Sequence, residues 1–595
     1  MLNFDSITVL LVILFIIYSL YTELIGPSFT FVTGILVLGL FGILSPSEIL
    51  SGFANEQILI ILMLLMIGEM IRSTGVLEGF FDRIFSKATT YKGFLGRMIV
   101  SISVFSAFLN NTPLVAILMP YVNTWSHRHN ISPSKLLIPL SFAAILGGCA
   151  TLIGTSTNLI VNGLLQAQTI IPGYRTFDIF DFVYAGVPMI FVGLAFLFLF
   201  SKKLLPDHKD VLEKFAENTR NYLVQTRIRT DSILIGSTVR EAKLRNLEGL
   251  FLAEILRENT TITPVSPSER LLPEDILVFA GETNTIADLV KTKAGLELAE
   301  IGMFSRKAHA EAIEVVISYN STLAGRTVKD TMFRSKFDAA VIAVHRNGEQ
   351  ITGKIGQVKL RPGDVLLLVA GPDFNNNSKQ SQDFYLISRV KDYRRSKPYE
   401  PILLIGGLIV SILLSALNLV PLFLSLAILI TVSLLVKIIN PKELPRSIDF
   451  NLAIIIAMSL ALGQAMTKTG VAAHIADFLV YVFMPFGVLS VMFGIYIISA
   501  LLSAYITNKA AVAILFPIVM TIALQMQLDP LPFILVMTYA AAASFLTPIG
   551  YQTNLMVYGP GGYNFKDFFK IGFPLTILYM VVSVMILYFM FVHVY

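Results

Sequence analysis

Two short stretches decide how the rest of the chain is interpreted. Residues 151–163 read TLIGTSTNLIVNG, and residues 547–559 read TPIGYQTNLMVYG. Both place glycine, threonine and asparagine at the same spacing inside runs of apolar residues. A helix can be interrupted at membrane depth only where protein or water satisfies the freed backbone groups. The repeated pattern therefore predicts two broken membrane helices that face a polar cavity.

The composition is that of a polytopic membrane protein. Of 595 residues, 55% are hydrophobic and 14% are charged, which is too apolar for a soluble protein of this size. The apolar runs at 7–18, 31–44 and 401–436 can cross a hydrocarbon core about 30 Å thick, alone or as closely spaced pairs. The first run has no basic segment before it, so we expect a retained helix and not a cleaved signal.

Each end of the chain predicts the same order of membrane segments: three spans, a polar-tipped hairpin and two further spans. The first set lies near residues 6–22, 28–44, 57–78, 136–164 and 181–201, with the hairpin at 91–125. The second lies near 400–417, 420–438, 450–471, 532–558 and 567–591, with the hairpin at 484–527. Because a re-entrant hairpin does not cross, each half crosses five times and the second half is inverted.

Basic residues in the short loops predict the orientation. Lys and Arg gather near residues 83–92, 128–135, 202–203, 437–446 and 566–570, and such loops face the cytoplasm. The N-terminus then lies outside, and residues 204–398 lie inside, at a plasma (cell inner) membrane. The net charge of +5 follows these loops, so no nucleic-acid partner is expected.

Further matches between the two halves indicate a duplication. SAFLNNTPLVAILMP at 106–120 aligns with SAYITNKAAVAILFP at 503–517, and GEMIRSTGV at 68–76 aligns with GQAMTKTGV at 463–471. The blocks occur in the same order at nearly constant separation. Inverted repeats with interrupted helices are typical of secondary transporters.

Residues between about 204 and 399 differ from both membrane halves. Charged residues are frequent there, and segments at 310–320, 339–346 and 364–371 have the length and β-branched content of strands. LLPEDILVFAG at 271–281 matches KLRPGDVLLLVAG at 359–371, each ending a unit of about 80 to 90 residues. The stretch DFNNNSKQSQD, from Asp373, is expected to be a flexible loop.

These observations predict one architecture. The fold class is a polytopic α-helical membrane protein with inverted repeats, two re-entrant hairpins and broken helices, and with an inserted cytoplasmic α/β domain of two similar units. The predicted segments are 1–203 for the first membrane repeat, 204–300 and 301–398 for the two inserted units, and 399–595 for the second membrane repeat.

The polar interruptions supply ligands for small ions. An unwound turn frees carbonyl oxygens, which suit a hard cation such as sodium, and a helix N-terminus offers N–H groups to an anion. The side chains of Asn111, Thr112, Thr157 and Asn508 add amide and hydroxyl groups. Asn and Thr also join neighbouring membrane helices without binding a ligand, but their duplication favours paired sites.

The Asn-Thr hairpin tip and the later Gly-Thr-x-x-Asn break resemble the divalent anion/sodium symporters, within the superfamily that includes arsenite permeases. The resemblance covers both membrane halves and implies homodimers that work as elevators. The chain departs from that family in lacking prolines before the asparagines of its breaks, and in carrying Lys509 where a Thr is common.

The resemblance also implies the site residues. Substrate is expected at Asn111, Thr112, Thr155, Ser156, Thr157, Asn508, Lys509, Tyr551, Gln552 and Thr553. Sodium, the expected coupling ion, is placed near Ser106, Asn110, Asn111, Gly154, Thr507, Asn508 and Gly550. No other cofactor is expected.

The inserted units are similar to TrkA-C domains, also called regulator-of-potassium-conductance C-terminal domains. The resemblance rests on Asp275, Asp364 and the strands that follow them. Such domains pair and bind small ligands, and membrane proteins of this layout are often assigned to sulfate uptake. We expect this insertion to regulate transport and not to carry it out, because the duplicated polar breaks all lie in the membrane halves.

Three other functions are weighed against sulfate uptake. A dicarboxylate or another oxyanion would suit the same pattern. A regulated ion channel is the rival from another class, but a K⁺ filter would need a T-V-G-Y-G-like loop, which the sequence lacks. An enzyme is not expected, because H-E-x-x-H, G-x-x-x-x-G-K-[ST] and G-x-G-x-x-G are all absent. The single cysteine, Cys149, excludes an intramolecular disulfide and a cysteine-based metal cluster.

Overall fold

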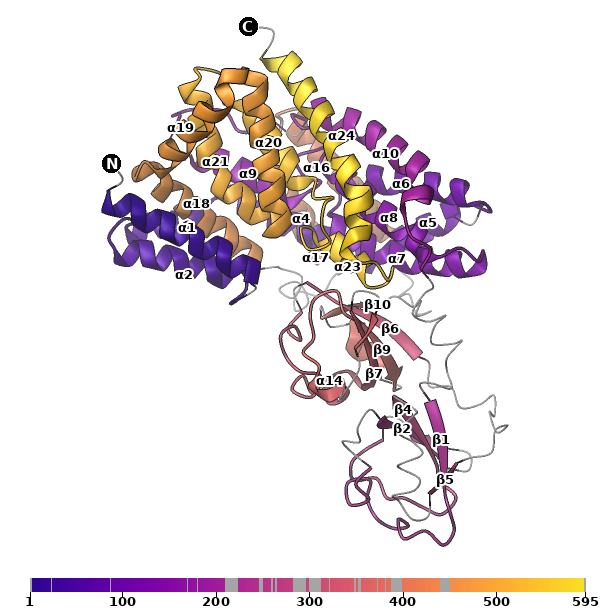
Figure 1. Ribbon diagram of the computed structural model, residues 1–595. Helices are drawn as coiled ribbons and strands as arrows, with labels where there is room; N and C mark the ends of the chain where they lie inside the picture. The colour runs from indigo at the N-terminus through magenta and orange to yellow at the C-terminus, as the bar shows by residue number, and fades with distance from the viewer. Residues whose placement is uncertain are drawn as a thin grey trace.

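A helical assembly carries two small β-sheet units on one side (Figure 1). The computed structural model describes residues 3–592, apart from residues 23, 86, 169, 179, 209–222, 245–249, 258–259, 263–264, 282–295, 299–311, 320, 347–348, 352–354, 372, 380, 382, 387–398 and 439–449.

The helical assembly comes from both ends of the chain. The N-terminal part contains α1 (Phe4–Thr22), α2 (Pro27–Leu40), α3 (Pro46–Ser51), α4 (Glu56–Ser73), α5 (Val76–Phe85), α6 (Tyr91–Ser106), α7 (Asn111–Arg128), α8 (Leu137–Gly148), α9 (Ser156–Ala167) and α10 (Val183–Leu204). The C-terminal part contains α16 (Tyr399–Ala416), α17 (Leu422–Leu435), α18 (Phe450–Lys468), α19 (Val471–Phe483), α20 (Val488–Tyr505), α21 (Asn508–Gln525), α22 (Pro530–Ala542), α23 (Gln552–Tyr558) and α24 (Phe565–Phe591).

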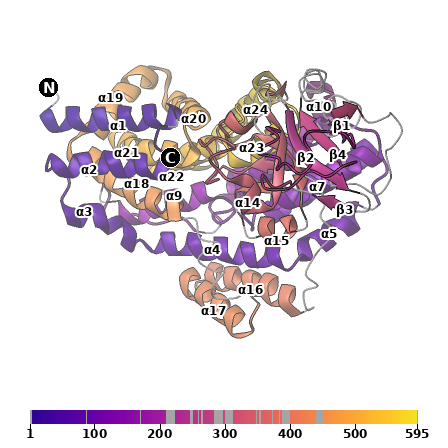
Figure 2. The same cartoon turned by 90° about the horizontal axis from the view of Figure 1, so that it is seen from below.

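The two parts interlock and do not form separate bundles. Helices α1 and α2 of the N-terminal part lie with α18, whereas α16 and α17 of the C-terminal part lie along α4 (Figure 2). The backbones of the two parts approach closely where the residue after α3, Gly52, meets α18. A Cβ on Gly52 would lie 2.5 Å from the carbonyl oxygen of Ala457. One hydrophobic core therefore runs through both parts.

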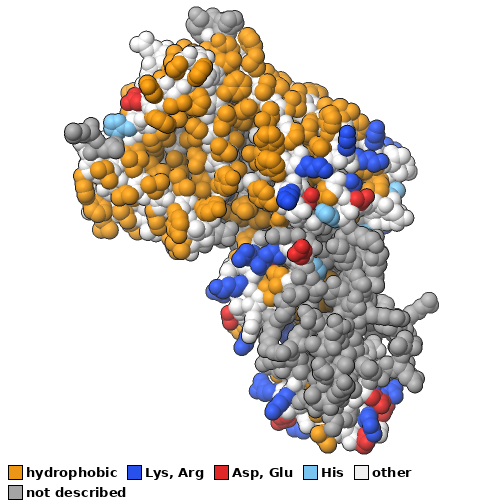
Figure 3. All heavy atoms as spheres, viewed as in Figure 1, with side chains coloured by type: hydrophobic (Ala, Val, Ile, Leu, Met, Phe, Trp, Pro, Cys, Tyr) orange, Lys and Arg blue, Asp and Glu red, His pale blue; other side chains and the backbone are white. Residues whose placement is uncertain are grey.

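The surface of the assembly is that of a membrane protein. Hydrophobic side chains cover the face seen in Figure 3, whereas Lys and Arg gather near its edge and on the sheet units. Six described helices are long and apolar enough to cross a bilayer, and the number rises to eight if each bent helix pair counts as one span. The two pairs bend by 42° at residue 55 and by 74° near Gly470.

The sheet units have the same plan. In the first, β1 (Leu223–Ile228), β2 (Leu250–Arg257), β3 (Thr260–Ile262), β4 (Ile276–Gly281) and β5 (Leu296–Leu298) pair in the order β3-β2-β4-β1-β5. In the second, β6 (Ala312–Ile317), β7 (Ala339–Arg346), β8 (Glu349–Gln350), β9 (Val365–Ala370) and β10 (Phe384–Leu386) pair in the order β10-β6-β9-β7-β8. All described pairings are antiparallel.

A buried carboxylate holds the same turn in each unit. Asp275 accepts hydrogen bonds from Arg257, at 2.9 Å to both Nε and Nη2, and Asp364 accepts two from Arg346 at 2.8 Å. Each pair is separated by 18 positions, and the two pairs lie 89 positions apart. The side chains of Asp275 and Asp364 are 0% and 1% exposed. Because a buried carboxylate is costly unless it is paired and hydrogen-bonded, each arginine stabilises its turn.

The structure contains helices that the sequence did not predict. The stretch predicted as a flexible loop contains the helix α15 (Phe374–Lys379), because Phe374 is 1% exposed and stacks on Phe384 in the core of the second unit. The sequence also missed α3, which a Ser45 capping box starts, and α19. The strands predicted at 310–320, 339–346 and 364–371 are confirmed as β6, β7 and β9.

Candidate functional site

The first hairpin tip is held in a defined shape by its own polar side chains. Asn110 caps α7, its Oδ1 accepting a hydrogen bond from the backbone N–H of Thr112 at 3.1 Å. Ser106, at the end of α6, donates to Asn111 Oδ1 and at 2.7 Å to the carbonyl oxygen of Ala144 in α8. The tip is therefore fixed to the first broken helix.

The break between α8 and α9 is built around one threonine. Thr151 Oγ1 donates to the carbonyl oxygen of Ala107 at the tip, and accepts a hydrogen bond from the Gly154 N–H at 3.1 Å. Asn158 Nδ2 donates to the Thr151 carbonyl oxygen at 2.8 Å. The break thus replaces lost helical hydrogen bonds with side-chain bonds, as the interior of a membrane protein requires.

The second tip and break make the corresponding contacts. Ser503 donates to the Ala541 carbonyl oxygen at 2.7 Å, and Thr547 donates to the Ala504 carbonyl oxygen at 2.8 Å. Thr547 Oγ1 also accepts from the Gly550 N–H at 3.1 Å, and Asn554 donates to the Thr547 carbonyl oxygen at 3.2 Å. These positions lie 396 or 397 residues after their counterparts in the first half.

The second break also bonds directly to the first half. The Tyr551 hydroxyl accepts from Asn111 Nδ2 at 2.7 Å and lies 3.0 Å from Thr155 Oγ1. Thr112 Oγ1 donates to Gln552 Oε1 at 3.1 Å. Ser141 Oγ of α8 lies 2.8 Å from Thr553 Oγ1 and 2.7 Å from Asn554 Oδ1, which accepts a hydrogen bond from it.

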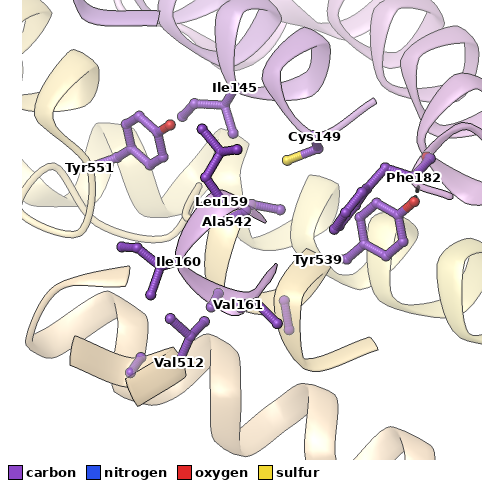
Figure 4. Close-up of a cluster of buried hydrophobic side chains, with 14 of the residues drawn as sticks. Ile145, Cys149, Leu159, Ile160, Val161, Phe182, Val512, Tyr539, Ala542 and Tyr551 are labelled. Atoms are coloured by element: carbon purple, nitrogen blue, oxygen red, sulfur yellow. Dashed lines mark hydrogen bonds between the residues drawn. The ribbon is translucent and has the colours of Figure 1, made fainter. Parts of the chain in front are cut away.

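Apolar side chains surround this polar junction. Figure 4 shows Tyr551 beside Ile145 of α8, with side chains of α9 packed toward Val512 of α21. Ile145, Val512 and their neighbour Ile160 are buried at 0% exposure. Polar bonds in such surroundings are stronger than in water, and an unpaired group is correspondingly costly.

A cavity of about 1240 Å³ opens between the two tips and the two breaks. Its lining includes the N-caps Asn110, Thr155, Thr507 and Tyr551, where α7, α9, α21 and α23 begin. Thr155 and Tyr551 make no side-chain capping bond within the described structure. The first backbone N–H groups of α9 are therefore not capped by Thr155, and helix N-termini favour anions.

The charge of the lining also favours an anion. Four basic residues contribute to it, and no acidic residue does among the described positions; the basic residues are Arg346, Lys359, Arg361 and Lys509. The pKa of the Arg346 guanidinium is raised, mainly by its hydrogen bonds to Asp364. A single-sign lining raises the local concentration of counter-ions.

The structure divides the predicted site residues into two groups. One group lines the cavity: Asn110, Thr112, Thr155, Ser156, Thr507, Asn508, Lys509, Gly550, Tyr551 and Gln552. The other is buried behind the wall: Ser106, Asn111, Gly154, Thr157 and Thr553. Of these, Asn111 is 2% exposed and donates a hydrogen bond to Tyr551, which lines the cavity.

Two buried hydroxyl groups near the breaks lack partners. Thr157 Oγ1 and Ser544 Oγ have no hydrogen-bond partner in the described part of the chain, although their residues are 0% and 5% exposed. Each unmade bond of this kind costs free energy. Among the described residues no cluster of His, Cys, Asp or Glu could hold a metal ion, so a cation here would take hydroxyl, amide and carbonyl oxygens.

Sequence reasoning missed one wall of the cavity. Residues of the second sheet unit line it together with the membrane residues, among them Tyr319, Arg346, Lys359, Arg361 and Tyr385. No expectation from the sequence placed the insertion at this cavity, and the regulatory role expected of it stays a prediction. A signal was present: the second turn reads LRPGD at 360–364 where the first reads LLPED at 271–275.

Comparison with known proteins identifies relatives along nearly the whole chain. The family described as CitMHS, citrate transporter, matches residues 10–499 and 487–595. The chain is 34% identical over 558 residues to a Chlamydomonas reinhardtii protein named as a sulfur deprivation response regulator, covering 91% of this chain and 94% of that protein. It is 32% identical over 588 residues to an uncharacterized transporter of Synechocystis, covering 96% and 94%.

A more distant relative is named for its substrates. The chain is 24% identical over 771 residues to sodium/sulfate cotransporter 1 of Chlamydomonas reinhardtii, covering 95% of this chain and 87% of that protein. The apolar helices, the broken spans and the polar cavity agree with these matches. The protein is a multi-pass membrane transporter, and it belongs to the CitMHS citrate-transporter family.

Proposed function

We propose that the protein is a secondary active transporter that imports a small divalent anion, sulfate, together with sodium, by an elevator motion. The observation that carries the proposal is the cavity, which joins helix N-termini, hydroxyl groups and basic side chains. The name of the distant sodium/sulfate relative supports the choice of ions. The narrower placement among the divalent anion/sodium symporters is part of this proposal.

Sodium would bind at the tips and breaks, beside the cavity. Ser106, Asn111 and Gly154 meet there in the first half, and Thr507, Asn508 and Gly550 lie at the corresponding place in the second. Carbonyl, amide and hydroxyl oxygens are suitable ligands for a hard cation. The unpartnered oxygens of Thr157 and Ser544 show that the same region has unused polar capacity among the described residues.

The proposed transport mechanism uses the two halves as inverted repeats with re-entrant hairpins. The matching contacts of Thr151 and Thr547 support the repeats. Helices α20 and α21 are each long enough to span a membrane. Their length therefore does not decide whether they cross the membrane or form a re-entrant hairpin. The placement of their joining residues, Thr507 to Lys509, at the cavity supports a hairpin that ends inside the protein.

The inserted units are proposed to be TrkA-C-like domains on the cytoplasmic side of the plasma membrane, acting within a homodimer. Their segments are 204–300 and 301–398, between membrane repeats at 1–203 and 399–595. The equal plans of the two sheets and the Arg–Asp pairs at Asp275 and Asp364 support two similar units. Regulation by a small molecule bound to these units remains the proposed role of the pair.

A carboxylate substrate is the second candidate, and two observations favour it. The family is described as citrate transporters. The cavity of about 1240 Å³ has room for an anion larger than sulfate, and its apolar lining includes Ile549 and Leu65. A dicarboxylate would place its carboxylates on the polar tips and its carbon chain on these side chains.

Uptake by the purified protein in liposomes tests the proposal. Radiolabelled sulfate and succinate are supplied separately, each with and without an inward sodium gradient. We expect saturable sulfate uptake that accumulates only with the gradient. Succinate uptake without sulfate uptake would favour the second candidate, and conductance without gradient-driven accumulation would show a channel.

Lys509 is expected to contact the anion directly. It aligns with Thr112, lies at the second tip and lines the cavity. A lysine at membrane depth costs at least about 2.5 kcal/mol on insertion scales, and a doubly charged anion would offset part of this cost. The alternative is that Lys509 extends to the membrane surface without contacting substrate.

The substitution Lys509→Thr tests this contact. We expect the KM for the anion to rise by about tenfold or more, since a charge-assisted bond contributes roughly 1.5–3 kcal/mol. Dependence on sodium is expected to increase. Lys468→Thr is the matched control, because Lys468 is 54% exposed and pairs with Glu48 away from the cavity. An unchanged KM and sodium Hill coefficient in Lys509→Thr would rule out the contact.

A further inference from the structure

The second sheet unit is seated on the broken helix of the C-terminal half. Its turn carries Gly363 at φ +84°, and a Cβ there would lie 2.9 Å from Leu555 Cδ1 in α23. A Cβ on Gly559 would in turn lie 2.5 Å from the Gly363 carbonyl oxygen. Val316 and Val365 of this unit belong to the hydrophobic core of the helical assembly. This unit is therefore packed against the membrane part through a specific close contact.

The equivalent turn of the first unit has different residues at the positions that contact the membrane part and the cavity. Its turn has Leu272 and Glu274 where the second unit has Arg361 and Gly363. Its core is a separate cluster that includes no residue of the helical assembly among the described positions. The two positions that differ are thus the basic residue at the cavity and the glycine that permits close approach to α23.

Three basic side chains of the second unit line the cavity, and two of them are not engaged in an ion pair among the described residues. The third, Arg346, is paired with Asp364 through hydrogen bonds of 2.8 Å. Lys359 and Arg361 are exposed, and neither forms an ion pair within the described structure. Both line the same cavity as Lys509 and the two hairpin tips. The side chains therefore add positive charge where the cavity meets the sheet unit.

We propose that Lys359 and Arg361 form an anion-attracting site at the cytoplasmic entrance of the cavity, which the transported dianion passes between the second sheet unit and the tips. This inference rests on the proposed anion transport, and it gives the second unit a direct part in the pathway. Convergent charge of one sign in a confined opening raises the rate at which counter-ions enter. Because the effect is electrostatic, salt should weaken it.

The first test measures the charge at the entrance without requiring transport. Ile549, which is 50% exposed and lines the cavity, is replaced by cysteine in a Cys149→Ala background, so that the chain has one reactive thiol. The full-length protein is treated with methanethiosulfonate reagents that carry either a sulfonate or a trimethylammonium group. The measured quantity is the ratio of the anionic to the cationic modification rate.

The double variant Lys359→Gln/Arg361→Gln is expected to lower this ratio by about threefold or more at low ionic strength. The matched control is Arg240→Gln/Arg270→Gln, which removes the same charge from the first unit, where Arg270 is equivalent to Lys359. The control should keep the wild-type ratio. High salt should remove the difference in ratio between the wild type and Lys359→Gln/Arg361→Gln. Equal ratios in the two double variants would overturn the inference.

The second test measures uptake by the same two double variants in liposomes, with the sheet units facing the medium that supplies the anion. We expect the KM for the transported anion to rise about threefold or more in Lys359→Gln/Arg361→Gln, with the control unchanged. A lowered modification ratio with an unchanged KM would overturn the role of this site in transport. If the wild-type protein shows no gradient-driven anion uptake, the proposed function itself fails, whereas normal wild-type uptake with equal variants refutes only the entrance site.

Discussion

Replacing Asn111 or Asn508 by alanine is expected to lower anion uptake by about 100-fold or more. Asn111 accepts a bond from Ser106 and donates at 2.7 Å to the Tyr551 hydroxyl, so it joins the first tip to the second break. Its loss leaves buried polar groups unpaired, at roughly 1–3 kcal/mol each. Asn508, 8% exposed, holds the corresponding place at the second tip and accepts from the Lys509 N–H at 2.9 Å.

The same helix offers a control for this prediction. Asn123, also in α7, is 6% exposed, and its Oδ1 has no hydrogen-bond partner in the part of the chain that the structure describes. Asn123→Ala should therefore keep uptake within about threefold of wild type. Uptake into liposomes is compared with the unfolding temperature in detergent. Wild-type uptake by Asn111→Ala or Asn508→Ala would refute the proposed role of the tips.

Adding one methyl group at Gly154 or Gly550 is expected to abolish uptake and destabilise the fold. A Cβ on Gly154 would lie 2.7 Å from the Gly148 carbonyl oxygen and 2.9 Å from that of Ser106. A Cβ on Gly550 would collide with Ser544 Oγ and lie 2.9 Å from the Ser503 carbonyl oxygen. Backbone atoms cannot move aside cheaply in a packed core, and overpacking costs about 1–3 kcal/mol or more.

Substitution by alanine should keep or raise the stability at glycines that lie in open helix positions. A Cβ on Gly68 in α4 or Gly463 in α18 would meet no atom within 4 Å among the described residues. Alanine favours a helix over glycine by about 0.8–1 kcal/mol, so Gly68→Ala and Gly463→Ala should retain uptake and unfold at the wild-type temperature or above. If Gly154→Ala and Gly550→Ala behave like these two, the close approach of tip and break has no role in transport.

The membrane elements were largely predictable because their environment leaves few choices. Apolar runs long enough to span a bilayer become helices, since no water is present to satisfy an extended backbone. The observed break between α8 and α9, at 149–155, overlaps the stretch 151–163, and the break between α22 and α23, at 543–551, overlaps the stretch 547–559 but begins four residues before it. Helix α19 was missed, because its sequence is apolar and continues from α18 with a bend that hydropathy does not register.

The ligand roles of the site residues remain predictions, but their arrangement is now specific. The sequence could not show that Asn111 lies behind the cavity wall while Thr112 lies on it, because both belong to the same tip. Nor could it show that Tyr551 bonds to Asn111, since 440 positions separate the two residues. Such contacts depend on how remote helices pack against one another.

By itself, the sequence determined the membrane class, the positions of the polar breaks and the presence of strands in the insertion, because each follows from local composition and hydrogen-bonding need. Only the tertiary structure decided that the two halves interlock, that Tyr551 joins their sites and that Arg361 faces the cavity. The physical reason is that a membrane restricts each segment separately, whereas the choice of partner depends on the shapes of distant surfaces, such as Gly363 against Leu555.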